Sequence, residues 1–168
     1  MKPNLEIKIG GIKLKNPVMV SSGTFGYGIE FDGLSNIKEL GAIVTKTITL
    51  HAKAGNKPPR VVETPSGMLN SIGLQNPGVD RFLKEKLPHL RKFKIPVIVS
   101  IGGGSIEEYK ELAEKLDRVD AISGIEINIS CPNISTSEII AQNKELTGKT
   151  VKAVRSATQK SIITKLSP

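Results

Sequence analysis

Short apolar runs alternate with helix-like segments along most of this 168-residue chain, and that order constrains the possible folds more than any other feature. The runs are continuously apolar, which is typical of strands that are buried on both faces of a parallel sheet. Helices between successive strands carry the chain back to the same end of such a sheet. Five parallel strands are therefore predicted, over residues 17–22, 42–47, 95–101, 124–130 and 161–165.

Other elements are expected before and between these strands. Residues 5–15 alternate apolar and polar side chains around Gly10 and Gly11, which predicts an N-terminal β-hairpin. Residues 49–75 form a long excursion with a strand candidate at 61–63, and excursions of this length are usually functional or disordered. Apolar spacing and capping signals predict helices over residues 31–40, 76–92, 105–117 and 143–157.

Small polar or charged residues follow each predicted strand, and they share one edge of the sheet because parallel strands have their carboxyl ends together. A (β/α) barrel gathers its active site at this edge, and a doubly wound sheet also binds ligands there. The chain ends directly after its fifth strand, in the middle of what would be an eight-stranded barrel. We interpret residues 1–168 as a single α/β domain, the N-terminal part of a (β/α)8 TIM barrel. The alternative is a complete five-stranded α/β domain.

The net charge of the chain limits the kinds of molecule that it is expected to bind. The net charge of +8 and the isoelectric point of about 9.6 allow nucleic-acid binding. The lysines are spread out, however, and many share predicted helices with glutamate, so the charge better fits attraction of small anions. No apolar run approaches the ~18 residues of a membrane span, and no signal peptide is evident. With a single cysteine, these features favour a cytoplasmic protein that binds neither nucleic acid nor membrane. His51 and His89 have no partners at metal-ligand spacing, so no metal site is expected.

The only cysteine, Cys131, follows the predicted strand 124–130 and lies between Asn128 and Asn133. A thiol at the carboxyl end of a buried strand, flanked by two amides, fits a catalytic acid, base or nucleophile with polar groups that orient a substrate. A lone cysteine is also often an inert, buried small side chain. Position alone leaves both interpretations open.

Four segments taken together point to a family. They are Ser-Gly-Thr-Phe-Gly-Tyr-Gly at 22–28, Val-Thr-Lys-Thr-Ile-Thr at 44–49, Asn-Ser-Ile-Gly-Leu-Gln-Asn-Pro-Gly at 70–78 and Asn-Ile-Ser-Cys-Pro-Asn at 128–133. In this order they resemble the dihydroorotate dehydrogenase family, most closely its class 1B catalytic subunits. The resemblance extends over nearly the whole chain, which it identifies as the N-terminal half of such a subunit.

The resemblance implies a (β/α)8 barrel with FMN at its C-terminal mouth and an enzyme that oxidises dihydroorotate to orotate in pyrimidine (UMP) biosynthesis. It implies that Cys131 is the base that removes the C5 proton while hydride passes from C6 to the flavin. It further implies a partner subunit with an iron–sulfur cluster and FAD, electron transfer to NAD, and a homodimer core within a heterotetramer.

The resemblance also assigns roles to individual residues. Those expected to contact the substrate are Lys46, Asn70, Ser71, Ile72, Gly73, Leu74, Asn128 and Asn133. Those expected to contact FMN are Ser22, Lys46, Thr47, Ser100, Asn128 and Lys165. Each type also has an ordinary structural role, because lysines at strand ends are often solvated and asparagine favours turns.

Two departures from the family pattern stand out. Ser100 occupies a position where the family usually carries asparagine, which shortens a polar reach toward flavin. Residues 134–144 replace a glycine-rich lid that ends in Gly-Thr-Asp-Pro. Because the family's sixth to eighth strands and its flavin phosphate site lie in the second half, we expect this chain alone to bind FMN weakly or not at all, and to expose apolar surface.

Two rivals stay open. A dihydropyrimidine dehydrogenase-like reductase shares the barrel and the Ser-Cys-Pro element, although Asn133 directly after Pro132 favours the orotate enzyme. A non-catalytic half-barrel fragment that only assembles with a partner is the rival from another class. It predicts a Cys131 thiol of ordinary reactivity and no bound flavin.

Overall fold

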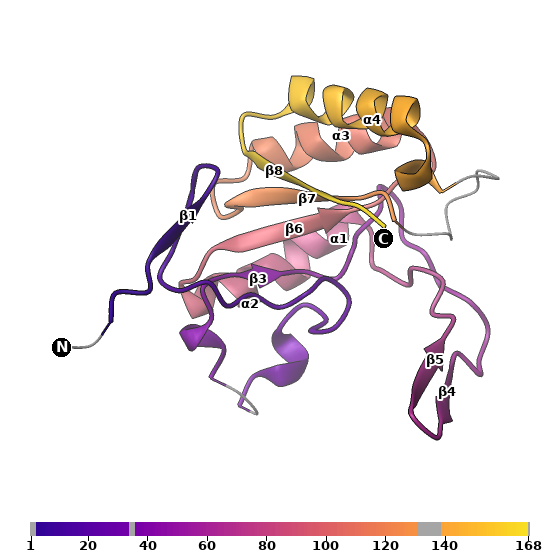
Figure 1. Cartoon of the computed structure of the whole chain (residues 1–168), viewed down its shortest axis with the longest axis horizontal. Helices are drawn as coiled ribbons and strands as arrows, with labels where there is room; N and C mark the ends of the chain where they lie inside the picture. The colour runs from indigo at the N-terminus through magenta and orange to yellow at the C-terminus, as the bar shows by residue number, and fades with distance from the viewer. Residues whose placement is uncertain (1–2, 34–35, 131–138, 168) are drawn as a thin grey trace.

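The computed structural model describes residues 3–33, 36–130 and 139–167. Its centre is a parallel sheet with the strand order β3-β6-β7-β8 (Figure 1). The strands are β3 (Ile43–Val44), β6 (Val97–Ile101), β7 (Gly124–Asn128) and β8 (Ser161–Lys165). The register sets Ser100 beside Glu126, and Asn128 beside Lys165. The predicted parallel α/β arrangement is therefore confirmed, with four paired strands in the described part.

The first predicted strand, 17–22, is wrong as a full strand. Only one parallel bridge forms in it, between Met19 and Ala42. Pro17 has no N–H to donate to a ladder, and the chain already turns at Ser21, whose carbonyl accepts from the Thr24 N–H at 3.3 Å. Too few residues lie between these two positions to build a longer ladder.

The strand predicted at 42–47 is shortened by a bulge. The N–H groups of Ile43 and Thr45 donate to carbonyls two residues apart on the neighbouring segment, those of Pro96 and Ile98. The next bond in the ladder comes from Ile48 to Ser100, so one extra residue lies on the β3 side. A β-bulge of this kind bends the strand and changes where its side chains point. It falls at residues 46–47.

The two faces of the sheet have different environments, because successive side chains of a strand point to opposite faces. The outer face packs on the helices, where the largest fully buried side chains include Phe82, Leu90, Tyr109, Leu112 and Leu116. The inner face is apolar near the amino ends of the strands, where Ile98 packs with Ile12 and Leu14. Those two residues come from the predicted hairpin, which is confirmed as β1 (Ile7–Ile9) paired antiparallel with β2 (Ile12–Leu14).

Two long helices lie side by side over β7 and β8 (Figure 1). The first, α3 (Ile106–Asp117), begins at Ser105, whose hydroxyl accepts from the Glu108 N–H. The second, α4 (Lys144–Ala157), begins at Asn143, whose side chain accepts from the Leu146 N–H. Both helices match the prediction because a side-chain cap satisfies backbone donors at each start.

The helix predicted at 31–40 is wrong. The described residues form two short 3-10 turns instead, η1 (Ile29–Phe31) and η2 (Ile37–Glu39). Asp32 has an extended backbone and Gly33 follows it at a φ of 85°, so neither continues a right-handed helix. The apolar spacing in this segment reflects separate contacts with the core.

The helix predicted at 76–92 forms a mixed helical run that starts later. It comprises α1 (Val79–Arg81), the π-helical η3 (Phe82–Lys86), α2 (Leu87–Leu90) and the 3-10 turn η4 (Arg91–Phe93). Pro88 has no N–H for the regular i to i−4 bond, and the hydrogen-bond pattern changes next to it. The expected cap, Asn76, instead accepts from the N–H groups of Gly78 and Thr49.

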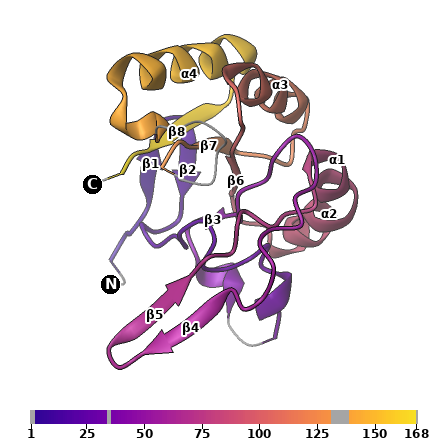
Figure 2. The ribbon, with the colours of Figure 1, turned by 90° about the vertical axis from the view of Figure 1, so that its right-hand side faces the viewer.

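The long excursion contains a second hairpin that projects from the body (Figure 2). It pairs β4 (Val61–Thr64) with β5 (Gly67–Asn70). The first strand was predicted over 61–63, but the second was missed because its Gly-Met-Leu-Asn sequence does not alternate. Its apolar side chains are exposed, with Met68 at 60% and Leu69 at 64%.

A further 3-10 turn, η5 (Ile140–Gln142), precedes α4. Across the described ranges, no helix combines the length and the apolar character that crossing a membrane requires.

Candidate active site

One hollow of about 520 Å³ lies where the strands end at their carboxyl side. Every described residue that was predicted to contact substrate or flavin lines it, except Ser100. The described residues that line it are Ser22, Gly23, Thr24, Lys46, Thr47, Asn70, Ser71, Ile72, Gly73, Leu74, Asn128 and Lys165. Segments far apart in the sequence thus meet at one place.

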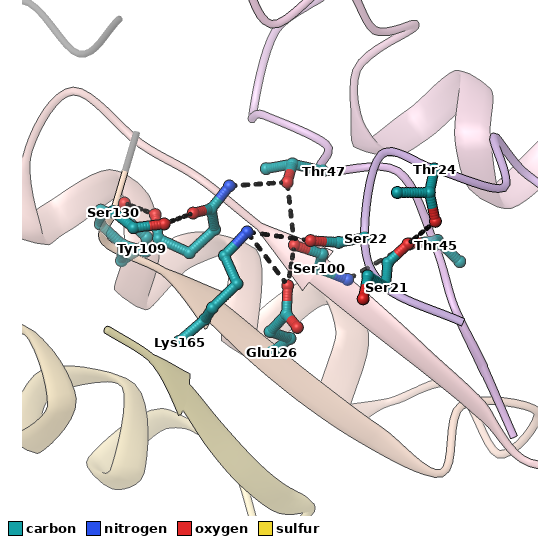
Figure 3. A network of polar contacts seen from close by, with 11 residues as sticks. Ser21, Ser22, Thr24, Thr45, Thr47, Ser100, Tyr109, Glu126, Ser130 and Lys165 are labelled. Atoms are coloured by element: carbon teal, nitrogen blue, oxygen red, sulfur yellow. Dashed lines mark hydrogen bonds and ion pairs between the residues drawn. The ribbon is translucent and has the colours of Figure 1, made fainter. Parts of the chain in front are cut away.

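A chain of hydrogen bonds forms the floor of this hollow (Figure 3). Asn128 Nδ2 donates to Thr47 Oγ1 at 2.9 Å, and that oxygen lies 2.9 Å from Ser100 Oγ. Ser100 Oγ donates onward to Glu126 Oε1 at 2.7 Å. All four residues are buried. Because every member has a partner, the floor is a satisfied polar network and holds its side chains in fixed positions.

Ser100 lies within this floor and does not line the hollow. It is fully buried, its hydroxyl is shared between Thr47 and Glu126, and its N–H donates to Thr45 Oγ1 at 3.2 Å. The structure therefore places the residue predicted to touch flavin one layer below the surface that a ligand would meet.

Glu126 is the functional candidate that sequence analysis missed. It lies on the inner face of β7, two residues before Asn128, and its side chain is 10% exposed. Its Oε1 accepts from Ser100 and lies 3.9 Å from Lys165 Nζ. The signal was present in the sequence, because a carboxylate inside a buried strand is rare unless it is paired.

Lys165 ends β8 and reaches across the hollow. Its Nζ donates to Ser22 Oγ at 3.0 Å and forms the longer contact with Glu126 (Figure 3). The side chain is 37% exposed, so one side of the ammonium group faces the hollow. A cation held at this point supplies positive charge to any ligand in the hollow.

Asn128 is held from three directions. Its Nδ2 donates to Thr47, its Oδ1 accepts from Ser130 Oγ at 3.0 Å, and its backbone carbonyl accepts from the Tyr109 hydroxyl at 2.8 Å. Tyr109 belongs to α3, so the helix layer fixes the end of β7. An amide with so few accessible orientations is suited to recognising one ligand geometry.

Lys46 and Thr47 owe their places to the bulge after β3. The Lys46 N–H leaves the ladder and donates to the Gly26 carbonyl at 2.8 Å, which ties the strand end to the glycine-rich loop. Thr47 is 4% exposed and joins the floor, while Lys46 is half-buried and lines the hollow. The bulge therefore lets Lys46 line the hollow while its neighbour Thr47 stays buried in the floor network.

The loop 70–74 closes another side of the hollow, and the preceding excursion supports it. Asn56 Nδ2 donates to the Ser71 carbonyl at 3.0 Å and to its hydroxyl at 2.8 Å. The Ser71 N–H donates to the Arg60 carbonyl at 2.7 Å. Gly73 and Leu74 both have positive φ, 72° and 55°, which gives the loop a tight turn.

Two predicted site residues, Cys131 and Asn133, lie outside the described residues, as does the segment up to residue 138. The last described residue before them, Ser130, is hydrogen-bonded to Asn128 at the floor. Among the residues that the structure describes, no three or more His, Cys, Asp or Glu side chains are grouped so that they could hold a metal ion.

The chain matches one family model over most of its length. Residues 4–168 match the family described as dihydroorotate dehydrogenase.

Individual relatives agree with that match. The chain is 54% identical over 168 residues to the catalytic subunit of dihydroorotate dehydrogenase B (NAD(+)) of Geotalea daltonii, which covers 99% of this chain and 55% of the relative. It is 51% identical over 166 residues to the subunit of the same name from Thermoanaerobacter pseudethanolicus, which covers 98% of this chain and 55% of that relative. The chain thus spans about half the length of the curated relatives it matches.

Proposed function

This chain belongs to the dihydroorotate dehydrogenase family, and on that premise we propose that it forms part of an enzyme that oxidises dihydroorotate to orotate in pyrimidine biosynthesis. The observation that carries the proposal is the single hollow in which Lys46, the loop 70–74, Asn128 and Lys165 meet. The proposed fold of the whole enzyme is a (β/α)8 barrel, of which the four-stranded sheet is a part.

FMN is the proposed cofactor, and the residues present fit the polar edge of its ring. Thr47 and Asn128 offer hydroxyl and amide groups at the floor, Ser22 lines the hollow, and Lys165 adds a cation beside it. When bound, FMN would supply the acceptor for the hydride from C6 of the substrate. Lys165 would stabilise negative charge at the pyrimidine end of the ring, while Ser100 would act through Thr47.

The proposed substrate contacts come from Lys46 and from the side-chain amides of Asn128 and Asn133. The Lys46 ammonium group would bind the substrate carboxylate, while Asn128 and Asn133 would hold the polar edges of its ring. Cys131 would take the C5 proton as a thiolate, so that the C5–C6 double bond forms as hydride departs from C6. A free cysteine has a pKa of about 8.5, and nearby cations or amide donors favour the thiolate.

Partner subunits belong to the proposal as well. The relatives are named as catalytic subunits of an enzyme that uses NAD(+). We propose that this chain delivers electrons to NAD through a second subunit with an iron–sulfur cluster and FAD, and that the catalytic subunit forms a homodimer within a heterotetramer.

The first test measures FMN binding by absorbance and fluorescence. The chain alone is expected to bind FMN weakly or not at all. Mixing or fusing it with the part of the Geotalea daltonii subunit that it does not match is expected to restore binding. If flavin binding does not rise on addition of that part, the proposed completion of the site is wrong.

The second test identifies the substrate in the completed protein. Anaerobic dihydroorotate is expected to bleach the flavin, while dihydrouracil leaves it oxidised. Preferential reduction by dihydrouracil would point to the dihydropyrimidine dehydrogenase-like rival instead. Cys131→Ala is expected to bind FMN normally and to slow bleaching by about 10²-fold or more, because the base is removed.

A further inference from the structure

A second hollow lies next to the first one and has no place in the proposed reaction. It encloses about 680 Å³ between the glycine-rich loop, the end of β3 and the start of the helical run 79–93. Among the described residues, it is lined by Tyr27, Lys46, Ala52, Lys53, Ala54, Gln75, Asn76, Pro77, Arg81 and Lys86. Lys46 lines both hollows, so the two are neighbours.

The charge around this second hollow is one-sided. Lys46, Lys53, Arg81 and Lys86 line it, and no acidic residue does so within the described part of the chain. Arg81 is paired with Glu85 at 2.8 Å, but no described carboxylate pairs with any of the three lysines. Each of these lysines is half-buried, so an anion bound between them would be screened by water less well than on an open surface.

Tyr27 gives an independent sign of a missing partner. It is 6% exposed, and its hydroxyl has no hydrogen-bond partner among the described residues. Burial, together with the nearby Glu30 carboxylate, raises the pKa of Tyr27 above its ordinary value, so the hydroxyl stays a protonated donor well into the alkaline range. Lys86 Nζ lies over the same ring, 6.0 Å from its centre.

We propose that the second hollow binds a small anion that carries two or more phosphate or carboxylate groups. Its volume lies within the range of about 300–1,000 Å³ that is typical of small-ligand sites, which favours a small molecule over a protein surface. The lysines supply point charges suited to such oxygens. The Tyr27 hydroxyl is closed off from solvent in this structure, so it gains a ligand oxygen as its acceptor only if the side chains that cover it move on binding. This inference does not rest on the proposed function.

The test is a calorimetric titration of the chain with inorganic pyrophosphate, and in parallel with citrate, at one fixed ionic strength. Saturable binding of either anion is expected. The double variant Lys53→Gln/Lys86→Gln is expected to weaken that binding about tenfold or more, because two charge-assisted contacts are lost. Amide NMR shifts on titration are expected to concentrate at residues 52–54 and 75–81.

The matched control is Lys84→Gln/Lys92→Gln, which removes the same charge from exposed positions on the same helical run, outside the hollow. It is expected to bind as the parent chain does. If both double variants lose the same affinity for the anion, the loss reflects the net charge of the protein and not the hollow, and the proposal is overturned. No saturable binding of either anion below about 10 mM would overturn it as well.

Tyr27→Phe separates a binding role from a structural one. Removing a buried hydroxyl without a partner is expected to leave the free energy of unfolding unchanged or raised. The affinity for the anion is expected to fall about three- to tenfold. Unchanged affinity in a folded Tyr27→Phe variant would remove the hydroxyl from the site and contradict the inference drawn from it.

Discussion

Lys165 Nζ donates to Ser22 Oγ at 3.0 Å, across 143 positions of the sequence. This bond joins the end of β8 to the segment that follows the first apolar run, and it crosses the candidate active site. Lys165 is also held from below by Glu126. Residues 22 and 165, far apart in the sequence, are therefore joined directly at the hollow.

Removing the Lys165 ammonium group is expected to loosen the start of the glycine-rich loop. In Lys165→Met, hydrogen exchange of the backbone amides at 22–26 should become about tenfold faster, because Ser22 loses its only tether in the described part of the chain. Mass spectrometry of peptic fragments measures this rate. Lys152→Met, at an exposed position of α4, should leave it unchanged. Equal exchange in all three proteins would contradict the tether.

Loss of the Glu126 carboxylate is expected to destabilise the floor network. Glu126→Ala removes the acceptor of a buried hydroxyl, that of Ser100, and should lower the free energy of unfolding by about 1–3 kcal/mol. Glu126→Gln keeps an acceptor oxygen and should lose less. Urea unfolding followed by circular dichroism gives both values. Glu111→Ala, on the exposed side of α3, should stay within about 0.5 kcal/mol of the parent chain.

Asn56 is expected to position the loop 70–74 without touching the ligand. In the flavin-loaded, completed protein, Asn56→Ala should weaken orotate binding about three- to tenfold, because Ser71 loses two hydrogen bonds. Stopped-flow absorbance of the flavin reports the affinity. Asn4→Ala, which affects only an exposed local contact with Glu6, is the control. A large loss of global stability in Asn56→Ala would instead mark the residue as structural.

Asp117 is expected to make part of the stability depend on pH. Its carboxylate accepts from Thr158 Oγ1 at 2.6 Å and from the Gln159 N–H at 2.8 Å, and these bonds lower the pKa of the carboxyl group below its usual 3.8. The contribution is therefore present above that value, and it is lost as the pH falls through the lowered pKa.

The measurement compares Asp117→Asn with the parent chain. At pH 7 the variant should unfold more easily, by about 0.5 kcal/mol, because solvent screens a charge near the surface. The difference should shrink as the pH falls from 4 toward 2. Asp120→Asn, an exposed carboxyl with no hydrogen bond or ion pair among the described residues, serves as the control. A difference that stays constant over this range would mean that the charge does not contribute.

Local signals in the sequence were enough to predict the helices and strands whose position depends on a few neighbouring residues. Side-chain caps at Ser105 and Asn143 set the starts of α3 and α4. Runs rich in isoleucine or valine set β6, β7 and β8, and β6 and β7 are fully buried even though polar residues lie among them. Polar residues at the carboxyl ends of the parallel strands then had to share one edge, and that predicted Lys46, Asn128 and Lys165 at one site.

The predictions for other elements were wrong because contacts with residues distant in the sequence determine their conformation. The spacing at 31–40 resembled a helix, yet the residues make separate contacts with the core. The strand Gly67–Asn70 has no pattern of its own and exists because β4 pairs with it. Neither outcome is encoded in a short window of sequence.

By itself, then, the sequence determined most of the order of strands and helices and the edge of the sheet where the site would form, since both follow from local apolar patterning and turn chemistry. The family followed separately, from the resemblance of four sequence segments to its members. The tertiary structure alone decided that Ser100 lies within the floor and does not line the hollow, that Glu126 supports Lys165, and that a bulge separates Lys46 from Thr47. The register between strands sets these relationships, and register depends on packing across the whole sheet.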